Sequence, residues 1–286
     1  METLERDPET MQEKADEAME AMLPINNYLY IDEKGEHLHT LRGKPLIGTS
    51  SVVKTAYPFS NLYWASGMAC SIFGWLNPKY NSSESVKTKA NEVLEQIKGL
   101  DVETYLSLLD KAYKAHAEKR DLAAEAGTDL HSLLEDYVKE CISTNEGKPL
   151  LGLNAQIQGF TDWAIGNVEK FLASEVHTYS EKKWLGGIVD CVAKLKDGKI
   201  AIFDFKSSKE AYDGHFFQIS LYDIQLREKG GYTPRGDKIL KLVKADCYIV
   251  VPFGNEKLVP AIRYNTKQLR EVGRSLLKTY RVIKKI

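Results

Sequence analysis

The sequence predicts an α/β (α+β) protein with a helical first half and a sheet-containing second half. Apolar residues recur at helical spacing over residues 46–173, and short apolar runs divided by turn signals follow from residue 174. The 286 residues, 43% of them hydrophobic, can bury a large core. We therefore expect an acidic arm with short strands over 1–45, a helical region over 46–173 and a mixed core over 174–286.

Glycine, proline and capping residues divide the helical half into segments. After short strands or loops over 28–47, a helix capped by Ser50 or Ser51 is expected to stop at Tyr57-Pro58. Longer helices are then predicted near 61–76, 84–98, 101–124 and 128–143, the last separated by Gly127 and capped by Thr128. A further helix is predicted over 154–173, because one helical face would carry Ile157, Phe160, Trp163, Ala164, Val168 and Phe171.

The second half follows a βββαββα order. Strands are predicted over 175–181, 184–195 and 199–206, the last two joined by the turn Lys196-Asp197-Gly198-Lys199. A helix over 213–229, strands over 245–253 and 258–264, and a closing helix over 266–284 complete the pattern.

Charge is segregated to the two ends of the chain. The net charge is −1, which excludes a global positive field that would attract polyanions. Residues 1–22 are strongly acidic, whereas 267–286 carry seven bases and one acid. At 100° per residue, six of these seven basic side chains, all except Lys284, fall within an arc of about 80°. We expect Arg270, Arg274, Lys278 and Arg281 to face outward and contact phosphates, the alternative being an ordinary solvated face.

Cysteine spacing and hydropathy restrict the other classes of site. The four cysteines lie far apart without a Cys-x-x-Cys motif, so neither a zinc ribbon nor an iron–sulfur cluster is expected. The acidic start does not resemble a secretory signal, and we expect reduced thiols and a cytoplasmic location. The uncharged segment 55–78 contains proline, asparagine and glycine, so we interpret it as a buried helix and expect no membrane partner.

Two carboxylates and a lysine lie within the predicted strands. Asp190 follows Gly187-Ile188-Val189, and Asp204 and Lys206 end the apolar run Ile202-Phe203. Burying a carboxylate in an apolar strand is costly unless it is paired or binds a cation. These residues alone leave a divalent-metal site and a structural ion pair equally open.

Five short motifs in one order resemble the PD-(D/E)XK nuclease superfamily, in particular its RecB-type branch of phage, CRISPR-associated and mitochondrial genome maintenance exonucleases. They are Gly127-Thr128-x-x-His131, Glu175, Gly187-x-x-Asp190, Asp204-x-Lys206 and Gln218-x-x-x-Tyr222. The resemblance covers roughly residues 45 to 265. It implies a restriction-endonuclease-like fold, in which helices flank a central mixed sheet and the helical half packs over the active site.

The resemblance also implies roles for individual residues. Asp190, Asp204, the Phe205 carbonyl and His131 would bind Mg²⁺ or Mn²⁺. Lys206 would position the attacking water, and Glu175 would assist the metal or the water. Gln218 and Tyr222, at i and i+4 of one helix, would hold the substrate backbone or the waters of the metal.

The function expected from this resemblance is metal-dependent hydrolysis of DNA. The protein would be an exonuclease on single strands or DNA ends, in phage or bacterial recombination, repair or replication. The alternatives are a nucleic-acid-binding protein of the same fold without catalysis, and a structure-specific endonuclease or RNA nuclease.

Overall fold

The computed structural model describes residues 28–33, 36–58, 66, 69, 83–152, 154–253 and 259–286. They form two compact units, one from Met1–Ala56 with Leu130–Ile286 and one from Tyr57–Asp129. The predicted helical region therefore contributes to both units. The acidic arm over 1–22 and nearly all of the predicted helix at 61–76 lie outside the described residues.

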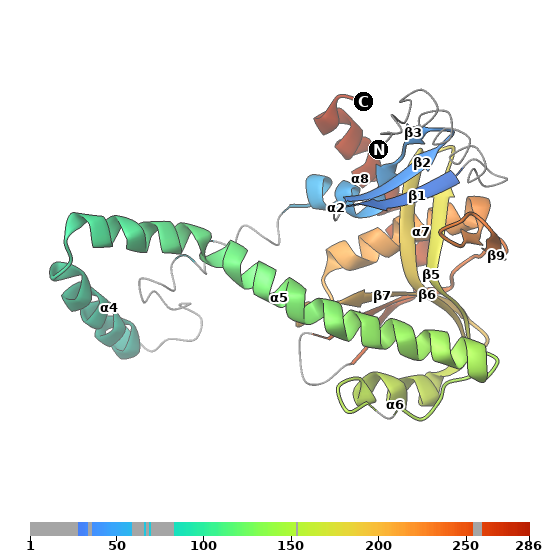
Figure 1. The fold of residues 1–286 in the computed structure, drawn as a ribbon, viewed down its shortest axis with the longest axis horizontal. Coiled ribbons are helices and arrows are strands. Elements are labelled where there is room, and N and C mark those ends of the chain that lie inside the picture. The colour runs from blue at the N-terminus through green and yellow to red at the C-terminus, as the bar shows by residue number, and fades with distance from the viewer. Residues whose placement is uncertain are drawn as a thin grey trace, which may run out of the picture. The chain divides into compact units, whose positions relative to one another are not determined.

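A mixed sheet forms the centre of the first unit (Figure 1). Its strand order is β11-β10-β7-β6-β5-β8-β9, and β4 pairs with the start of β6. Parallel pairing joins β10 to β7, while antiparallel pairing joins β7, β6 and β5. The strands are β4 (Ile47–Gly48), β5 (Val168–Ser180), β6 (Leu185–Leu195), β7 (Ile200–Lys206), β8 (Gly231–Tyr232), β9 (Lys238–Leu240), β10 (Cys247–Pro252) and β11 (Ala261–Arg263).

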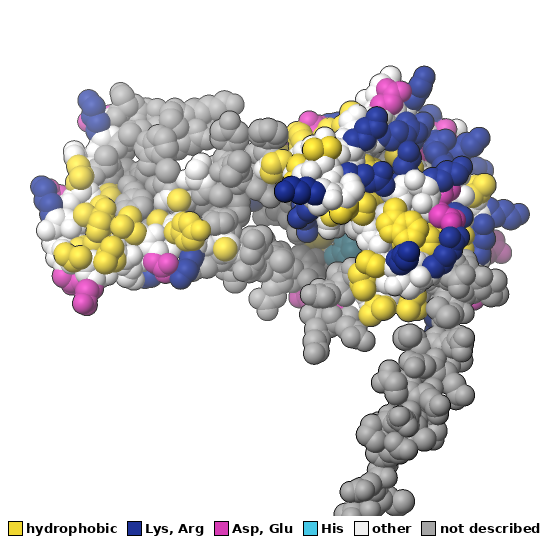
Figure 2. All heavy atoms as spheres, turned by 90° about the horizontal axis from the view of Figure 1, so that it is seen from above, with side chains coloured by type: hydrophobic (Ala, Val, Ile, Leu, Met, Phe, Trp, Pro, Cys, Tyr) yellow, Lys and Arg dark blue, Asp and Glu magenta, His cyan; other side chains and the backbone are white. Residues whose placement is uncertain are grey.

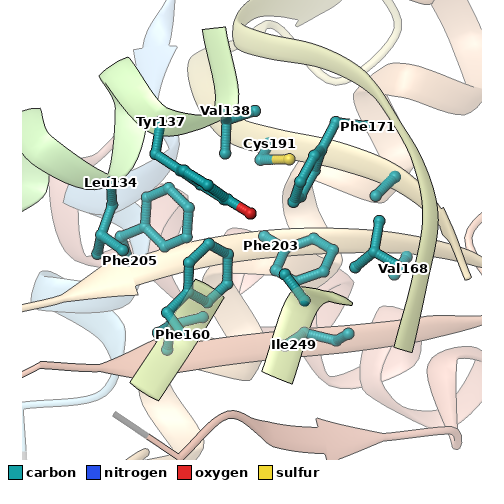
Figure 3. Packing of buried hydrophobic residues seen from close by; sticks show 14 of the residues in the cluster. Leu134, Tyr137, Val138, Phe160, Val168, Phe171, Cys191, Phe203, Phe205 and Ile249 are labelled. Carbon is teal, nitrogen blue, oxygen red and sulfur yellow. The ribbon is translucent and has the colours of Figure 1, made fainter. Parts of the chain in front are cut away.

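Helices cover both faces of this sheet. One apolar cluster joins α5 (Val102–Thr144) and α6 (Gln158–Asn167) to it, and a second joins α7 (Asp213–Lys229) and α8 (Thr266–Lys284). Figure 3 shows the first cluster, where Tyr137 of α5 and Phe160 of α6 point toward Phe203 and Phe205 of β7. The expectation of a mixed sheet flanked by helices is therefore confirmed.

A smaller antiparallel sheet packs against one end of the main sheet. It contains β1 (Tyr28–Glu33), β2 (Glu36–Leu41) and β3 (Lys44–Pro45). Tyr28, fully buried, stacks on Tyr179 of β5 with ring centroids 5.0 Å apart. The chain then enters α2 (Thr49–Ala56), which ends before Tyr57-Pro58 as predicted.

The predicted break at Gly127 is wrong, because α5 runs without interruption from Val102 to Thr144. A single glycine inside a helix costs only about 1 kcal/mol relative to alanine. The neighbouring Ala123, Ala124 and Ala126 have the highest helix propensity, which offsets that cost. The preceding helix, α4 (Ser83–Lys98), agrees with its predicted span.

The predicted helix over 154–173 is also wrong at its end, because β5 begins at Val168. Its pairing with β6 shifts register between Val168 and Lys170 and between Phe171 and Ala173. Such bulges add a residue to one strand, so Val168 and Phe171, three apart, both reach the cluster under α5. The bulged strand therefore has the same apolar spacing as a helix.

Candidate active site

The main sheet is distorted where Glu175 of β5 lies opposite Asp190 of β6. Regular pairs flank this rung, and the backbone of Glu175 has a φ of 46°. A non-glycine residue in the left-handed region is uncommon and tends to occur at functional sites.

The alternation of side chains between the two sheet faces also shifts by one residue at this rung in both strands, a change of phase. Val189 packs in the cluster beneath α7, whereas Cys191, two residues later, packs in the cluster beneath α5. On β5, Ala173 and Val176 share the α7 cluster although they are three residues apart. Residues two apart share a face in a regular strand. The phase change turns Glu175 and Asp190 toward α5, which supplies the side chains that pair with them.

Asp190 connects β6 to the end of β7. The β6–β7 ladder ends at the Cys191–Phe203 pair, and beyond it the Phe205 N–H donates a 2.6 Å hydrogen bond to Asp190 Oδ2. In a strand, the N–H and C=O groups of one residue point toward the same neighbouring strand. The Phe205 carbonyl therefore points toward β6, where Asp190 lies. Nε2 of His131 lies 3.4 Å from Asp190 Oδ2.

Asp204 is buried on β7, with 1% of its surface exposed. Its Oδ1 accepts a 2.7 Å charged hydrogen bond from Lys206 Nζ, while its Oδ2 is buried without a hydrogen-bond partner. Burial raises the pKa of Asp204 to about 6, although the lysine charge opposes that shift. Burial lowers the pKa of Lys206, but the charges of Asp204 and Asp190 outweigh it and raise that pKa overall.

Helix α5 contributes a row of charged side chains at four-residue spacing. His131 Nδ1 lies 3.2 Å from Glu135 Oε1, and Lys139 pairs with both Glu135 and Glu175. Burial, and then the charge of Glu175, raises the pKa of Glu135 to about 7, against the charges of His131 and Lys139. Burial disfavours the charged imidazole of His131, but the hydrogen bond to Asp190 together with the charges of Asp190 and Glu135 outweighs this and raises its pKa. The row connects α5 electrostatically to the Glu175–Asp190 rung.

Gln218 and Tyr222 lie together on α7, as predicted from their spacing. Gln218 Nε2 donates a 2.7 Å hydrogen bond to the Tyr222 hydroxyl. Burial, and then the charges of Asp204 and Asp190, raise the pKa of Tyr222 well above its usual value. Only a glycine fits beside this ring, because a Cβ on Gly187 would lie 2.5 Å from it. The Tyr222 ring is therefore in contact with β6 and within the electrostatic influence of both aspartates.

We expected four basic side chains of α8 to face outward, and this prediction is wrong for two of them. Arg270 Nη1 donates to Asp223 Oδ2 at 2.6 Å, and Arg281 Nη2 donates to the Lys183 carbonyl at 2.8 Å. Both are partly buried, while Arg274 and Lys278 are exposed as predicted. Helix α8 docks through Gly273, where a side chain would clash with Ser220 of α7. The close approach at Gly273 brings Arg270, about one turn earlier, to the docked side.

Three nearby residues were not predicted from the sequence. Lys139 continues the four-residue spacing of His131 and Glu135, which is a detectable signal. Thr49 donates to the Gly186 carbonyl and accepts from Gln225, contacts that no local pattern indicates. Burial, and then the charge of Lys206, lower the pKa of His215 to about 4.

The donor types suit a hard divalent cation, and the orphaned Asp204 oxygen offers a free ligand position. In the described part of the chain, no three His, Cys, Asp or Glu side chains form a ready-made metal group. Mg²⁺ does not need such a cage, because it commonly keeps several waters and binds through one or two carboxylates. Asp190 and Asp204 meet that smaller requirement, with His131 beside Asp190.

No family model matches this chain, and no curated protein matches it. Among the residues that the structure describes, no helix is both long enough and apolar enough to cross a membrane.

Proposed function

We propose that the protein is a metal-dependent nuclease that hydrolyses DNA phosphodiester bonds. The observation that carries the proposal is the buried Asp204, with one oxygen on Lys206 and the other unpartnered. A buried carboxylate oxygen without a partner is costly in a purely structural ion pair. A bound cation removes that cost.

Each residue then has a distinct task. Asp190 and Asp204 would hold Mg²⁺ or Mn²⁺, which when bound supplies Lewis acidity and lowers the pKa of a bound water. Lys206 holds its charge close to Asp204, where it orients a nucleophilic water and offsets developing negative charge. His131 orients Asp190 and is available as an additional ligand. Glu175, paired with Lys139, anchors the distorted rung.

Two arguments indicate the substrate class: the resemblance to nucleases, and the basic side chains of α8 that have no internal partner among the described residues. Arg274 and Lys278 are exposed on α8 and can contact phosphates without breaking an internal pair. We infer an exonuclease that acts on single-stranded DNA or DNA ends, in phage or bacterial recombination, repair or replication.

The test is cleavage of end-labelled single-stranded DNA in Mg²⁺, in Mn²⁺ and in EDTA. Asp204→Asn and Lys206→Ala are compared with Asp197→Asn and Lys199→Ala, which change the same residue types in the exposed β6–β7 turn. We expect metal-dependent degradation that both site variants abolish and both turn variants retain.

Other substrates separate the alternatives. Cleavage of closed circular DNA would refute the exonuclease assignment, and cleavage of RNA alone would identify a ribonuclease. DNA binding without cleavage under any metal would leave the non-catalytic binding protein. Normal cleavage by Lys206→Ala would show that the site is wrongly assigned.

A further inference from the structure

A pocket of about 800 Å³ lies at the end of the main sheet, within the first unit. Its walls come from β2, from the β3–β4 segment, from Trp184 before β6 and from the end of α8. The lining includes His39, Leu46, Ser51, Trp184, Tyr280 and Arg281. Its volume is within the range of pockets that hold small molecules.

The pocket adjoins the start of β6, the strand that also carries Asp190. Side chains two apart share a strand face, so Gly186, Ile188 and Asp190 point to one side. A Cβ on Gly186 would clash with His39 and approach Leu46, and both residues line the pocket. Four residues of strand separate Gly186 from Asp190, a distance of about 13 Å. A few nucleotides of single strand are enough to reach from one to the other.

The pocket combines aromatic side chains with positive charge. Trp184 has a φ of 49°, and its indole N–H donates to the Pro45 carbonyl at 2.9 Å. A bulky residue in the left-handed region is a genuine outlier, so this ring is held in place by its surroundings. Arg281 lines the wall, and exposed lysines at 44, 182, 284 and 285 lie on the adjoining segments. Figure 2 shows Lys and Arg side chains gathered on this face.

The start of α2 adds a third favourable element. Ser51, in the first turn of this helix, and Gly48, which directly precedes the helix, line the pocket. Helix N-termini carry unpaired backbone N–H groups and a partial positive charge, which favour a phosphate. Stacking surfaces, cations and a helix N-terminus together fit an unpaired nucleotide with its phosphate.

We propose that this pocket binds unpaired nucleotides of the strand whose phosphodiester lies at Asp190 and Asp204. A base stacks on Trp184 or Tyr280, and the adjoining phosphates lie against Arg281 and the exposed lysines. The inference rests on the proposed function, because it gives that nuclease a second contact with the same strand.

The test compares oligothymidylates of about four and about twelve nucleotides, lengths that bracket short single-strand sites. Fluorescence anisotropy in EDTA gives the affinity of each, and cleavage of each is measured in Mg²⁺. Trp184→Ala and Tyr280→Ala are compared with Tyr264→Ala, an exposed aromatic outside the pocket lining. Substituting 5-iodouracil into the longer strand and irradiating it then maps the contact by mass spectrometry.

We expect the wild-type preference for the longer strand to fall by roughly tenfold in each pocket variant and to remain in Tyr264→Ala. The photoproduct should lie on Trp184 or Tyr280, a result that misfolding of a variant cannot produce. Normal cleavage with an unchanged length preference and crosslinks elsewhere would overturn the pocket assignment but leave the nuclease intact. Absence of both binding and cleavage in the wild type would overturn the nuclease itself, and this inference with it.

Discussion

Exchanging Arg270 for glutamine tests whether α8 carries a structural arginine next to a phosphate-binding one. Arg270 donates to Asp223, which is fully buried and also accepts from Arg227 at 2.9 Å and from the Tyr248 hydroxyl at 2.8 Å. Arg274, one turn later, is exposed to solvent. Arg274→Gln is therefore a matched control on the same helix.

The expected magnitude follows from what Asp223 retains. Leaving a buried charge without compensation costs about 3–5 kcal/mol. Asp223 keeps Arg227 and Tyr248 after the exchange, so the loss is closer to that of one hydrogen bond to a charged group, about 2–3 kcal/mol. Arg274→Gln should change the free energy of unfolding by less than about 0.5 kcal/mol.

Urea denaturation followed by tryptophan fluorescence measures the difference. With a slope of about 1–3 kcal/mol per molar urea, the midpoint of Arg270→Gln should fall by roughly 1 M. DNA binding at several salt concentrations gives the complementary result. Removing one phosphate contact on a single strand reduces the slope of log K against log salt by about 0.7, and only Arg274→Gln should do so.

Two results would refute this reasoning. Equal denaturation midpoints for the two variants would show that the Arg270–Asp223 pair contributes nothing to stability. If the slope of log K against log salt fell only in Arg270→Gln, Arg270 rather than Arg274 would be the residue that contacts DNA phosphates.

Three further predictions concern the site. Burial raises the pKa of Asp204 from its unfolded value to about 6. The resulting stabilisation of the metal-free protein, up to about 3 kcal/mol, is fully present at pH values below the unfolded pKa and is lost as the pH rises through about 6. Mn²⁺ should therefore raise Tm more at pH 8 than at pH 5, and equal shifts would contradict a role for Asp204 in metal binding. Gly187→Ala should lower stability by about 1–3 kcal/mol and reduce cleavage, because its Cβ would lie 2.5 Å from the Tyr222 ring; an unchanged Tm would count against that contact. Glu175→Val should be less stable than Glu175→Gly by about 1–2 kcal/mol in thermal denaturation, because only glycine adopts a φ of 46° without cost. Equal stability would mean that the backbone relaxes at that rung.

The sequence predicted the elements that carry the aspartates because their patterns are regular. The turn at Asp197-Gly198 divides β6 from β7, and α7 spans 213–229 as expected. The two carboxylates and Lys206 therefore lie on neighbouring strands as the pattern indicated. Their partners on α5 depend on tertiary packing, and only their four-residue spacing is visible locally.

The failures have physical causes that a local pattern does not contain. Bulges in β5 give Val168 and Phe171 a helical spacing although they belong to a strand. On α8 the angular pattern identified a basic arc but not which face docks, because the close contact is made by Gly273. A hydrophobicity scale gives glycine little weight, so the sequence pattern did not mark the Gly273 side of α8 as the face that docks. Arg270, which lies on that side, was therefore expected to face solvent.

The phase change at Glu175 and Asp190 also has a consequence for protein engineering. The inward and outward positions on either side of this rung are set independently in β6, and in the part of β5 that follows its two bulges, because the alternation restarts at the rung. Segments recombined at that point keep their own alternation on either side, whereas a crossover elsewhere in β5 or β6 must preserve the parity of the whole stretch. The candidate active site is thus also the natural junction for building chimeras of this sheet.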